Sequence, residues 1–205
     1  MWSMQYWFDF LFPPRKDEVA LRDIPISTFL ALMSPTLIPA TKPETMTLLP
    51  FHNTSVRSVI HEAKYHGSER AFEFLAATLT KYLRDANEGF RNPIIVPMPL
   101  GNKRSKKRGF NQVVEIVKRA VIDLDISIDE TILKRTRETV SQVSLPRHKR
   151  EENMRGAFIT THPADPSRTY IVIDDVITTG ATLQAAIDAL QKAGAKRIRS
   201  LALAH

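Results

Sequence analysis

The sequence predicts an α/β fold, and two observations support this. Two short apolar runs, at residues 94–96 and 170–173, are each typical of a buried strand. A segment with the apolar spacing of an amphipathic helix follows each run, at residues 113–121 and 183–190. Strands that alternate with helices in this way favour a sheet with helices packed against it.

The stretch that joins the second strand to its helix carries the strongest functional signal. Asp174 and Asp175 stand where the strand is predicted to end, which is where open α/β sheets bind ligands. Small and hydroxyl-bearing residues follow and open the helix, whose unpaired N–H groups are suited to a phosphate. These residues are Thr178, Thr179, Gly180, Ala181 and Thr182.

Carboxylates in that position accept hydrogen bonds from ribose hydroxyls or hold Mg²⁺ through water. The stretch therefore predicts a ligand in which a ribose lies between a phosphate and a metal-bound group. It is not an ATP-binding P-loop, because no Gly-Lys-Ser/Thr follows.

Composition narrows the class of protein and of ligand. The chain has 205 residues, enough for one hydrophobic core, and a formal net charge of +7, which suits a polyanion such as a pyrophosphate ester or a nucleic acid. It has no cysteine, which excludes disulfides and thiolate metal sites. No apolar run is long enough to span a membrane and no basic signal-peptide start is present, so we expect a cytoplasmic protein.

We expect two regions, an N-terminal arm over residues 1–50 and a domain over residues 51–205. Residues 1–12 are rich in aromatic side chains. We interpret them as a helix packed on the domain, or on a second copy in a homodimer, in preference to a membrane-surface anchor. Residues 13–50 contain many prolines and no clear apolar period, which favours an irregular arm that is partly ordered against the domain.

Within the domain, apolar spacing predicts helices over residues 54–66 and 69–83. Residues 101–112, after the first strand, are interpreted as a loop in which five of the six positions from Lys103 to Arg108 are basic. Residues 131–160 are expected to form two short strands joined by a polar loop, which is either a lid or disordered. A final strand is expected at residues 198–204.

Residues 170–182 resemble the motif with which type I phosphoribosyltransferases bind 5-phosphoribosyl-1-pyrophosphate (PRPP). Three further stretches resemble one family, the ComF-like phosphoribosyltransferases. They are residues 56–67, which end in Lys-Tyr-His-Gly, residues 104–112, which contain Arg-Gly-Phe-Asn-Gln, and residues 133–158, which run from Leu-Lys-Arg to Gly-Ala-Phe. The likeness covers roughly residues 50–205 in order.

The resemblance implies a parallel sheet flanked by helices. It also implies transfer of ribose-5-phosphate from PRPP to an acceptor with release of pyrophosphate, and a link to DNA uptake. Family members often carry a cysteine-based zinc module after a Phe-Pro-Pro-Arg-like segment. Residues 12–15 have that segment, but no cysteine follows, so we expect no zinc.

These considerations assign a role to each candidate residue. We expect Asp174 and Asp175 to hold the ribose hydroxyls and orient Mg²⁺, and residues 178–182 to bind the 5′-phosphate. Arg104 and Arg108 are expected to bind the pyrophosphate, whereas Lys103, Lys106 and Lys107 fit a solvated surface equally well. Residues 136–150 would close as a lid, with Arg147 or Arg150 as a further donor.

Some purine-specific relatives have an aspartate where this chain has Thr178, and Thr is not a general base near neutral pH. A purine-salvage reaction that uses that device is therefore disfavoured, and the acceptor is not readable from the sequence.

Two other functions compete with an active transferase. One is a non-catalytic PRPP or nucleotide sensor, which an intact acidic pair fits equally well. The other is a single-stranded DNA-binding protein, in which the basic residues 103–108 and 147–150 would follow the backbone. Stacking aromatics should then be interleaved with those charges, and only Phe110 lies close to them in the sequence.

Overall fold

The computed structural model describes residues 18, 21–86, 89–136, 154 and 156–205. The expected aromatic helix at residues 1–12 lies outside the described residues. So do residues 137–150 of the expected lid, with Arg147 and Arg150.

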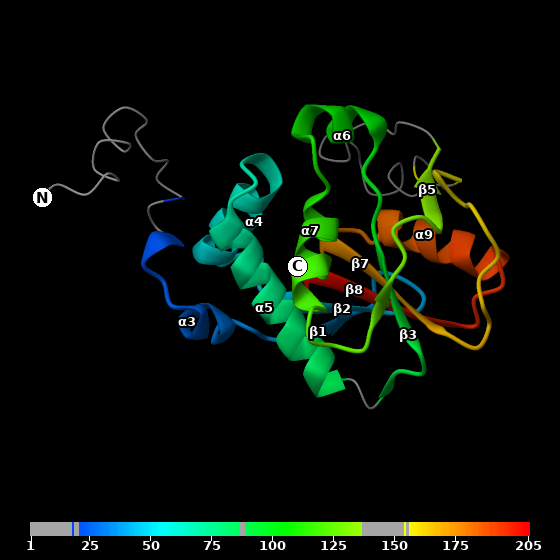
Figure 1. Cartoon of the computed structure of the whole chain (residues 1–205), viewed down its shortest axis with the longest axis horizontal. Coiled ribbons are helices and arrows are strands. Elements are labelled where there is room, and N and C mark those ends of the chain that lie inside the picture. The colour runs from blue at the N-terminus through cyan, green and yellow to red at the C-terminus, as the bar shows by residue number, and fades with distance from the viewer. Residues whose placement is uncertain (1–17, 19–20, 87–88, 137–153, 155) are drawn as a thin grey trace, which may run out of the picture.

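A six-stranded sheet forms the centre of the molecule, with the strand order β1-β2-β8-β7-β3-β4 (Figure 1). All neighbouring strands are parallel except β1, which pairs with β2 in the antiparallel direction. The predicted parallel sheet is thus confirmed. The strands are β1 (Thr36–Ile38), β2 (Thr45–Leu49), β3 (Pro93–Pro97), β4 (Ser127–Ile128), β7 (Thr169–Val176) and β8 (Arg197–Ala204).

Helices cover both faces of this sheet, which makes a three-layer α/β fold (Figure 1). One core lies under α3 (Ile26–Leu30), α4 (Thr54–Tyr65), α5 (Glu69–Ala86) and α7 (Gln112–Ala120). The other lies under α9 (Ala181–Lys192) and a two-stranded sheet of β5 (Leu133–Arg135) and β6 (Phe158–Thr160). The helices predicted from apolar spacing are all present.

Strand β7 contributes to both cores. Ile171 and Ile173 face the core under α4, α5 and α7, whereas Tyr170 and Val172 face the core under α9. Successive side chains of a strand point to opposite faces, so a strand covered on both sides must be apolar throughout. This explains the continuous apolar run in the sequence.

The expectation that residues 13–50 are irregular is wrong for β1 and β2. Strand β2 pairs in register with β8 from Thr45 opposite Ser200 to Leu49 opposite Ala204, so the sheet begins before the boundary that we placed at residue 50. The hydroxyls of Thr45 and Ser200 hydrogen bond to each other at 2.8 Å, which lets two polar side chains be buried between the strands. Because β2 contains such buried polar residues, it does not form an apolar run and was not recognised as a strand in the sequence.

The basic segment was also predicted incorrectly as a loop. Its residues form a short helix, α6 (Asn102–Arg108), which ends at Gly109 in the left-handed conformation, with φ 77°. Lys and Arg favour helices, and cations in a last turn interact well with the helix dipole. The helix lacks an apolar stripe, so periodicity could not reveal it.

The turn between β7 and α9 is fixed by its contact with the segment before β2. Gly180, the N-terminal cap of α9, has φ 77°. A Cβ atom at this position would lie 2.5 Å from the backbone oxygen of Ala40. The conformation and the close approach both require glycine here.

The first prediction tests whether β2 belongs to the folded core. Leu48 is 0% exposed, whereas Leu37 on the edge strand β1 is 51% exposed. We expect Leu48→Ala to lower the free energy of unfolding by about 2–5 kcal/mol, because it leaves a cavity. Leu37→Ala should change it by about 0.5 kcal/mol or less, as for a typical surface site. Chemical denaturation measures both, and equal effects would contradict the sheet register described above.

The second prediction concerns Gly180. We expect Gly180→Ala to lower the free energy of unfolding by about 1–3 kcal/mol, because a non-glycine residue is strained at this φ and its Cβ clashes with Ala40. Gly89 is the matched control, since a Cβ there meets nothing within 4 Å. Thermal unfolding of the two alanine variants compares them, and a Gly180→Ala protein as stable as Gly89→Ala would refute the contact.

Candidate functional site

A cavity of about 430 Å³ opens at the carboxyl ends of β3 and β7. This is the edge at which parallel α/β sheets bind ligands. Acidic, basic and apolar side chains from both halves of the chain line it. They are Phe51, Lys64, Met98, Pro99, Leu100, Arg108, Gln112, Arg135, Asp174, Asp175, Val176, Thr178 and Thr182.

The carboxylate of Asp175 is buried beneath this cavity, with 7% of the residue exposed. Its Oδ1 pairs with Lys64 Nζ at 2.9 Å, and its Oδ2 accepts a hydrogen bond from Gln112 Nε2 at 2.5 Å. Both oxygens are thus engaged by residues from α4 and α7. Such partners are needed because a buried carboxylate is costly without them.

The same network positions Arg108 at the end of α6. Its Nη1 donates to Gln112 Oε1 at 2.8 Å, and its guanidinium lies over the ring of Tyr65, 4.9 Å from the centroid. Two contacts from different helices thus hold this half-buried cation at the cavity wall.

Asp174 differs from its neighbour in environment. It is partly exposed, lines the cavity, and accepts the backbone N–H of Asp175 on Oδ1 at 2.8 Å. Both acids belong to β7, which continues to Val176, so the strand extends past the predicted end at residue 173. The adjacent carboxylates thus differ in burial, although both line the cavity.

The turn after β7 surrounds a small hollow lined by Asp174, Thr178, Gly180, Thr182 and their neighbours. Thr178 is exposed at its mouth, and Thr178 and Thr182 also line the larger cavity. Backbone N–H groups at a helix N-terminus are suited to an anion. Thr179 of the same turn, whose buried hydroxyl has no hydrogen-bond partner among the described residues, lines a separate cavity and not this hollow.

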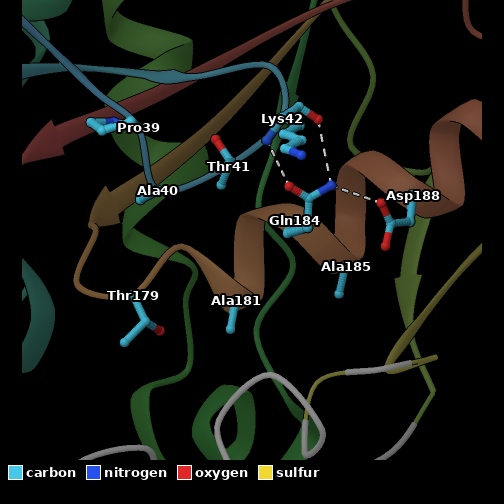
Figure 2. Close-up of a pocket in the computed structure, with 9 residues that line it drawn as sticks. All are labelled: Pro39, Ala40, Thr41, Lys42, Thr179, Ala181, Gln184, Ala185 and Asp188. Atoms are coloured by element: carbon cyan, nitrogen blue, oxygen red, sulfur yellow. Dashed lines mark hydrogen bonds between the residues drawn. The ribbon is translucent and has the colours of Figure 1, made fainter. Parts of the chain in front are cut away.

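On the far side of this turn, a second cavity of about 350 Å³ separates α9 from residues 39–42 (Figure 2). Figure 2 shows Gln184 of α9 bridging the two, since its side chain accepts from Lys42 N–H at 2.7 Å and donates to Asp188 at 2.8 Å. This bridge joins α9, which follows the turn, to the segment before β2.

The structure places Asp174, Asp175, Arg108 and residues of the turn 178–182 around the larger cavity and the small hollow. The backbone of Arg104 lies in α6, and Lys103, Lys106 and Lys107 are exposed on that helix. Sequence reasoning missed Lys64, Gln112 and Arg135 as cavity residues. Each lies within a stretch singled out for its family resemblance, and that was the available signal.

Within the described part of the chain, no helix combines the length and apolar character needed to cross a membrane.

Comparison with known proteins gives one domain match and two curated relatives. The phosphoribosyl transferase domain matches residues 106–205. Competence protein F of Haemophilus influenzae is 33% identical over 136 residues, which are 64% of this chain and 59% of that protein. Competence protein ComFC of Streptococcus pneumoniae is 28% identical over 153 residues, 74% of this chain and 64% of that protein. The chain thus spans about three-fifths of the length of these relatives.

Among solved structures, a hypoxanthine phosphoribosyltransferase from Staphylococcus aureus aligns with a TM-score of 0.39 and 15% identity, over 64% of this chain and 62% of that one. A purine phosphoribosyltransferase from Pyrococcus horikoshii aligns with a TM-score of 0.37 and 19% identity, over 64% and 71%. The matched domain and the two competence proteins support a likeness of this chain to the ComF-like type I phosphoribosyltransferases.

Proposed function

We propose that the chain binds PRPP in the cavity at the end of β7 and transfers its ribose-5-phosphate to an acceptor, with release of pyrophosphate. One observation carries the proposal. A carboxylate, a phosphate-sized turn at a helix N-terminus and a positioned arginine line connected hollows at one sheet edge. The three groups match the three parts of PRPP, which are the ribose hydroxyls, the 5′-phosphate and the pyrophosphate.

In the proposed reaction, the turn at residues 178–182 holds the 5′-phosphate with backbone N–H groups and threonine hydroxyls. Asp174 accepts hydrogen bonds from the ribose hydroxyls. Arg108 and Lys64 face the pyrophosphate. The acceptor forms its bond to ribose C1 while the C1–oxygen bond breaks and its electron pair leaves with pyrophosphate. The sugar passes through an oxocarbenium-like state, so holding both ends in place and stabilising the departing charge promotes the step.

The residues present also fit a Mg²⁺ ion, with unequal parts for the two acids. Mg²⁺ prefers oxygen ligands and is usually bound through one or two carboxylates together with phosphates of the substrate. Asp174 offers a carboxylate at the cavity, whereas Asp175 is engaged by Lys64 and Gln112. Asp174 would thus hold the ion, which when bound would offset the negative charge of the pyrophosphate.

Two alternatives share parts of this site. A sensor would bind PRPP without transferring it, and release of pyrophosphate in the presence of candidate acceptors separates the two. A single-stranded DNA-binding function is supported by the exposed lysines of α6. The names of the relatives support a role in competence without naming a ligand. However, Phe110 packs edge to face on Phe72, with the ring centroids 5.9 Å apart, and this contact engages the aromatic nearest those charges in the sequence.

The third prediction tests the acidic site. We expect the wild-type protein to bind PRPP in the presence of Mg²⁺, and Asp174→Asn to weaken this binding about 10- to 100-fold, because hydrogen bonds to a charged group are lost. Isothermal titration calorimetry measures the affinities. The control is Asp123→Asn, which makes the same charge change at an exposed carboxylate outside the cavity. If the Asp174→Asn and wild-type proteins bind PRPP with equal affinity, the proposal is wrong.

The fourth prediction separates PRPP binding from DNA binding with two neighbouring cations. We expect Arg108→Ala to weaken PRPP binding about 10-fold or more, while Lys107→Ala, which removes an exposed charge, has little effect. If the basic helix instead follows a DNA backbone, each substitution should reduce the salt dependence of single-stranded DNA binding by about the same amount. Titrations of both ligands at several salt concentrations decide between the two.

A further inference from the structure

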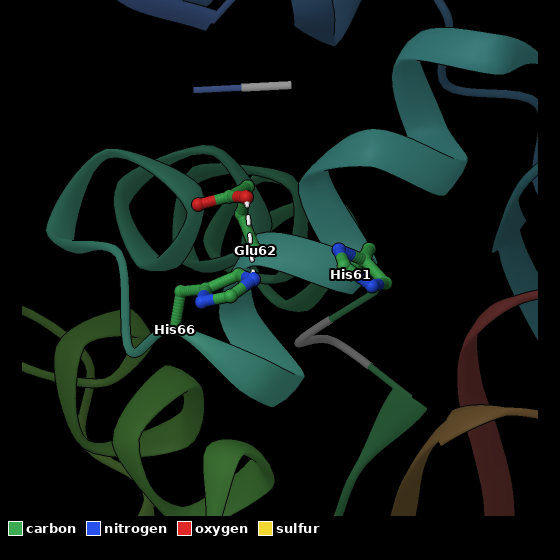
Figure 3. A group of neighbouring side chains, drawn as sticks. All are labelled: His61, Glu62 and His66. Carbon is green, nitrogen blue, oxygen red and sulfur yellow. Dashed lines mark ion pairs between the residues drawn. The ribbon is translucent and has the colours of Figure 1, made fainter. Parts of the chain in front are cut away.

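Three side chains with metal-binding groups meet at the C-terminal end of α4, outside the cavity described above. His61 and Glu62 belong to the helix, and His66 is its C-cap. One donor atom from each lies within 4.8 Å of the others, and Figure 3 shows the glutamate beside the His66 ring. We propose that His61, Glu62 and His66 bind a transition-metal ion of the zinc class.

The separation of the donor atoms fits a shared ion. Glu62 Oε1 lies 3.8 Å from His66 Nε2, which is too long for a hydrogen bond. Two ligands at 2.0–2.2 Å from one tetrahedral zinc ion stand about 3.4 Å apart, so a shift of a few tenths of an ångström brings this pair to zinc distances. His61 is exposed, and the centroid of its ring lies 5.5 Å from that of His66 and 4.9 Å from that of Tyr65.

A cation beside Glu62 is compatible with the burial of this residue. Its side chain is 0% exposed, and a buried carboxylate is stabilised only by partners that offset its charge. A divalent ion offsets that charge while the imidazoles supply neutral ligands. Two nitrogens and one carboxylate oxygen suit zinc and its neighbours, whereas Mg²⁺ and Ca²⁺ favour oxygen ligands. Our expectation of no zinc rested on the missing cysteines, and histidine and carboxylate ligands lie outside that reasoning.

An ion here would act on the segment that carries Lys64. The backbone oxygen of Glu62 accepts N–H groups from both His66, at 3.1 Å, and Ser68, at 3.4 Å, where the helix ends. Lys64 lies between the ligands in sequence and pairs with Asp175. The site would therefore clamp the last turn of α4, and a fourth coordination position would remain for water or another ligand.

The experiment uses the full chain after treatment with a chelator, with zinc alone as the probe. We expect one equivalent of Zn²⁺ to bind by competition with a chromophoric chelator, and Co²⁺ to give the absorption bands of a tetrahedral site. His61→Ala with His66→Ala should weaken binding about 100-fold or more, because two of three ligands are lost. His52→Ala removes an exposed imidazole just before α4 and should leave binding unchanged.

Substoichiometric zinc binding by the wild type, or unchanged affinity in the double variant, would overturn the proposal. His61 is exposed and the His66 side chain is 29% exposed, so the double variant should keep the melting temperature of the metal-free wild type, and buried Glu62 is left in place. The measurement needs neither PRPP nor Mg²⁺. Its failure would leave the proposed function intact, and a failure of PRPP binding would leave the zinc site intact.

Discussion

The buried carboxylate of Asp175 joins strand β7 to two of the helices that cover the sheet. It lies on β7 and is engaged by Lys64 from α4 and by Gln112 from α7, which itself receives a hydrogen bond from Arg108 of α6. A buried carboxylate needs an ion-pair or hydrogen-bond partner on each of its two oxygens. This need restricts Lys64 and Gln112 to one arrangement. This requirement fixes the positions of Lys64 and Arg108 at the cavity.

The parts of the fold that were predictable are those in which packing dictates composition. Strand β7 is buried on both faces, so it appears in the sequence as a continuous apolar run, whereas α5 packs one face on the core, so its apolar residues recur at helical spacing. The parts of the fold that were not predictable are stabilised by other means than an apolar face. Strand β2 buries threonines against Ser200 of β8, and α6 packs no apolar stripe at all. What stabilises β2 is a strand that is distant in the sequence, and what stabilises α6 is the interactions at its ends.

The candidate site likewise has a part that the sequence could predict and a part that it could not. Asp174 to Thr182 are contiguous, so their chemistry could be read directly from the sequence. The pairing of Gln112 with Asp175 joins residues 63 positions apart and exists only because β3 and β7 are neighbours in the sheet. Sequence reasoning therefore assigned both acids the same task. The structure adds that Asp175 is the more buried of the two and has Lys64 and Gln112 on its two oxygens, which only the fold can show.

This difference bears on the acceptor in the proposed reaction. Among the described residues that line the cavity, the carboxylates are Asp174 and Asp175 alone, and Asp175 is matched by Lys64 and Gln112. Asp174 must face the ribose, and Thr178 does not accept a proton near neutral pH. The described walls therefore offer cations and apolar surface, from Phe51, Met98 and Leu100, and no spare general base. An acceptor whose nucleophilic atom is already unprotonated at neutral pH matches such a cavity better than one that must first lose a proton.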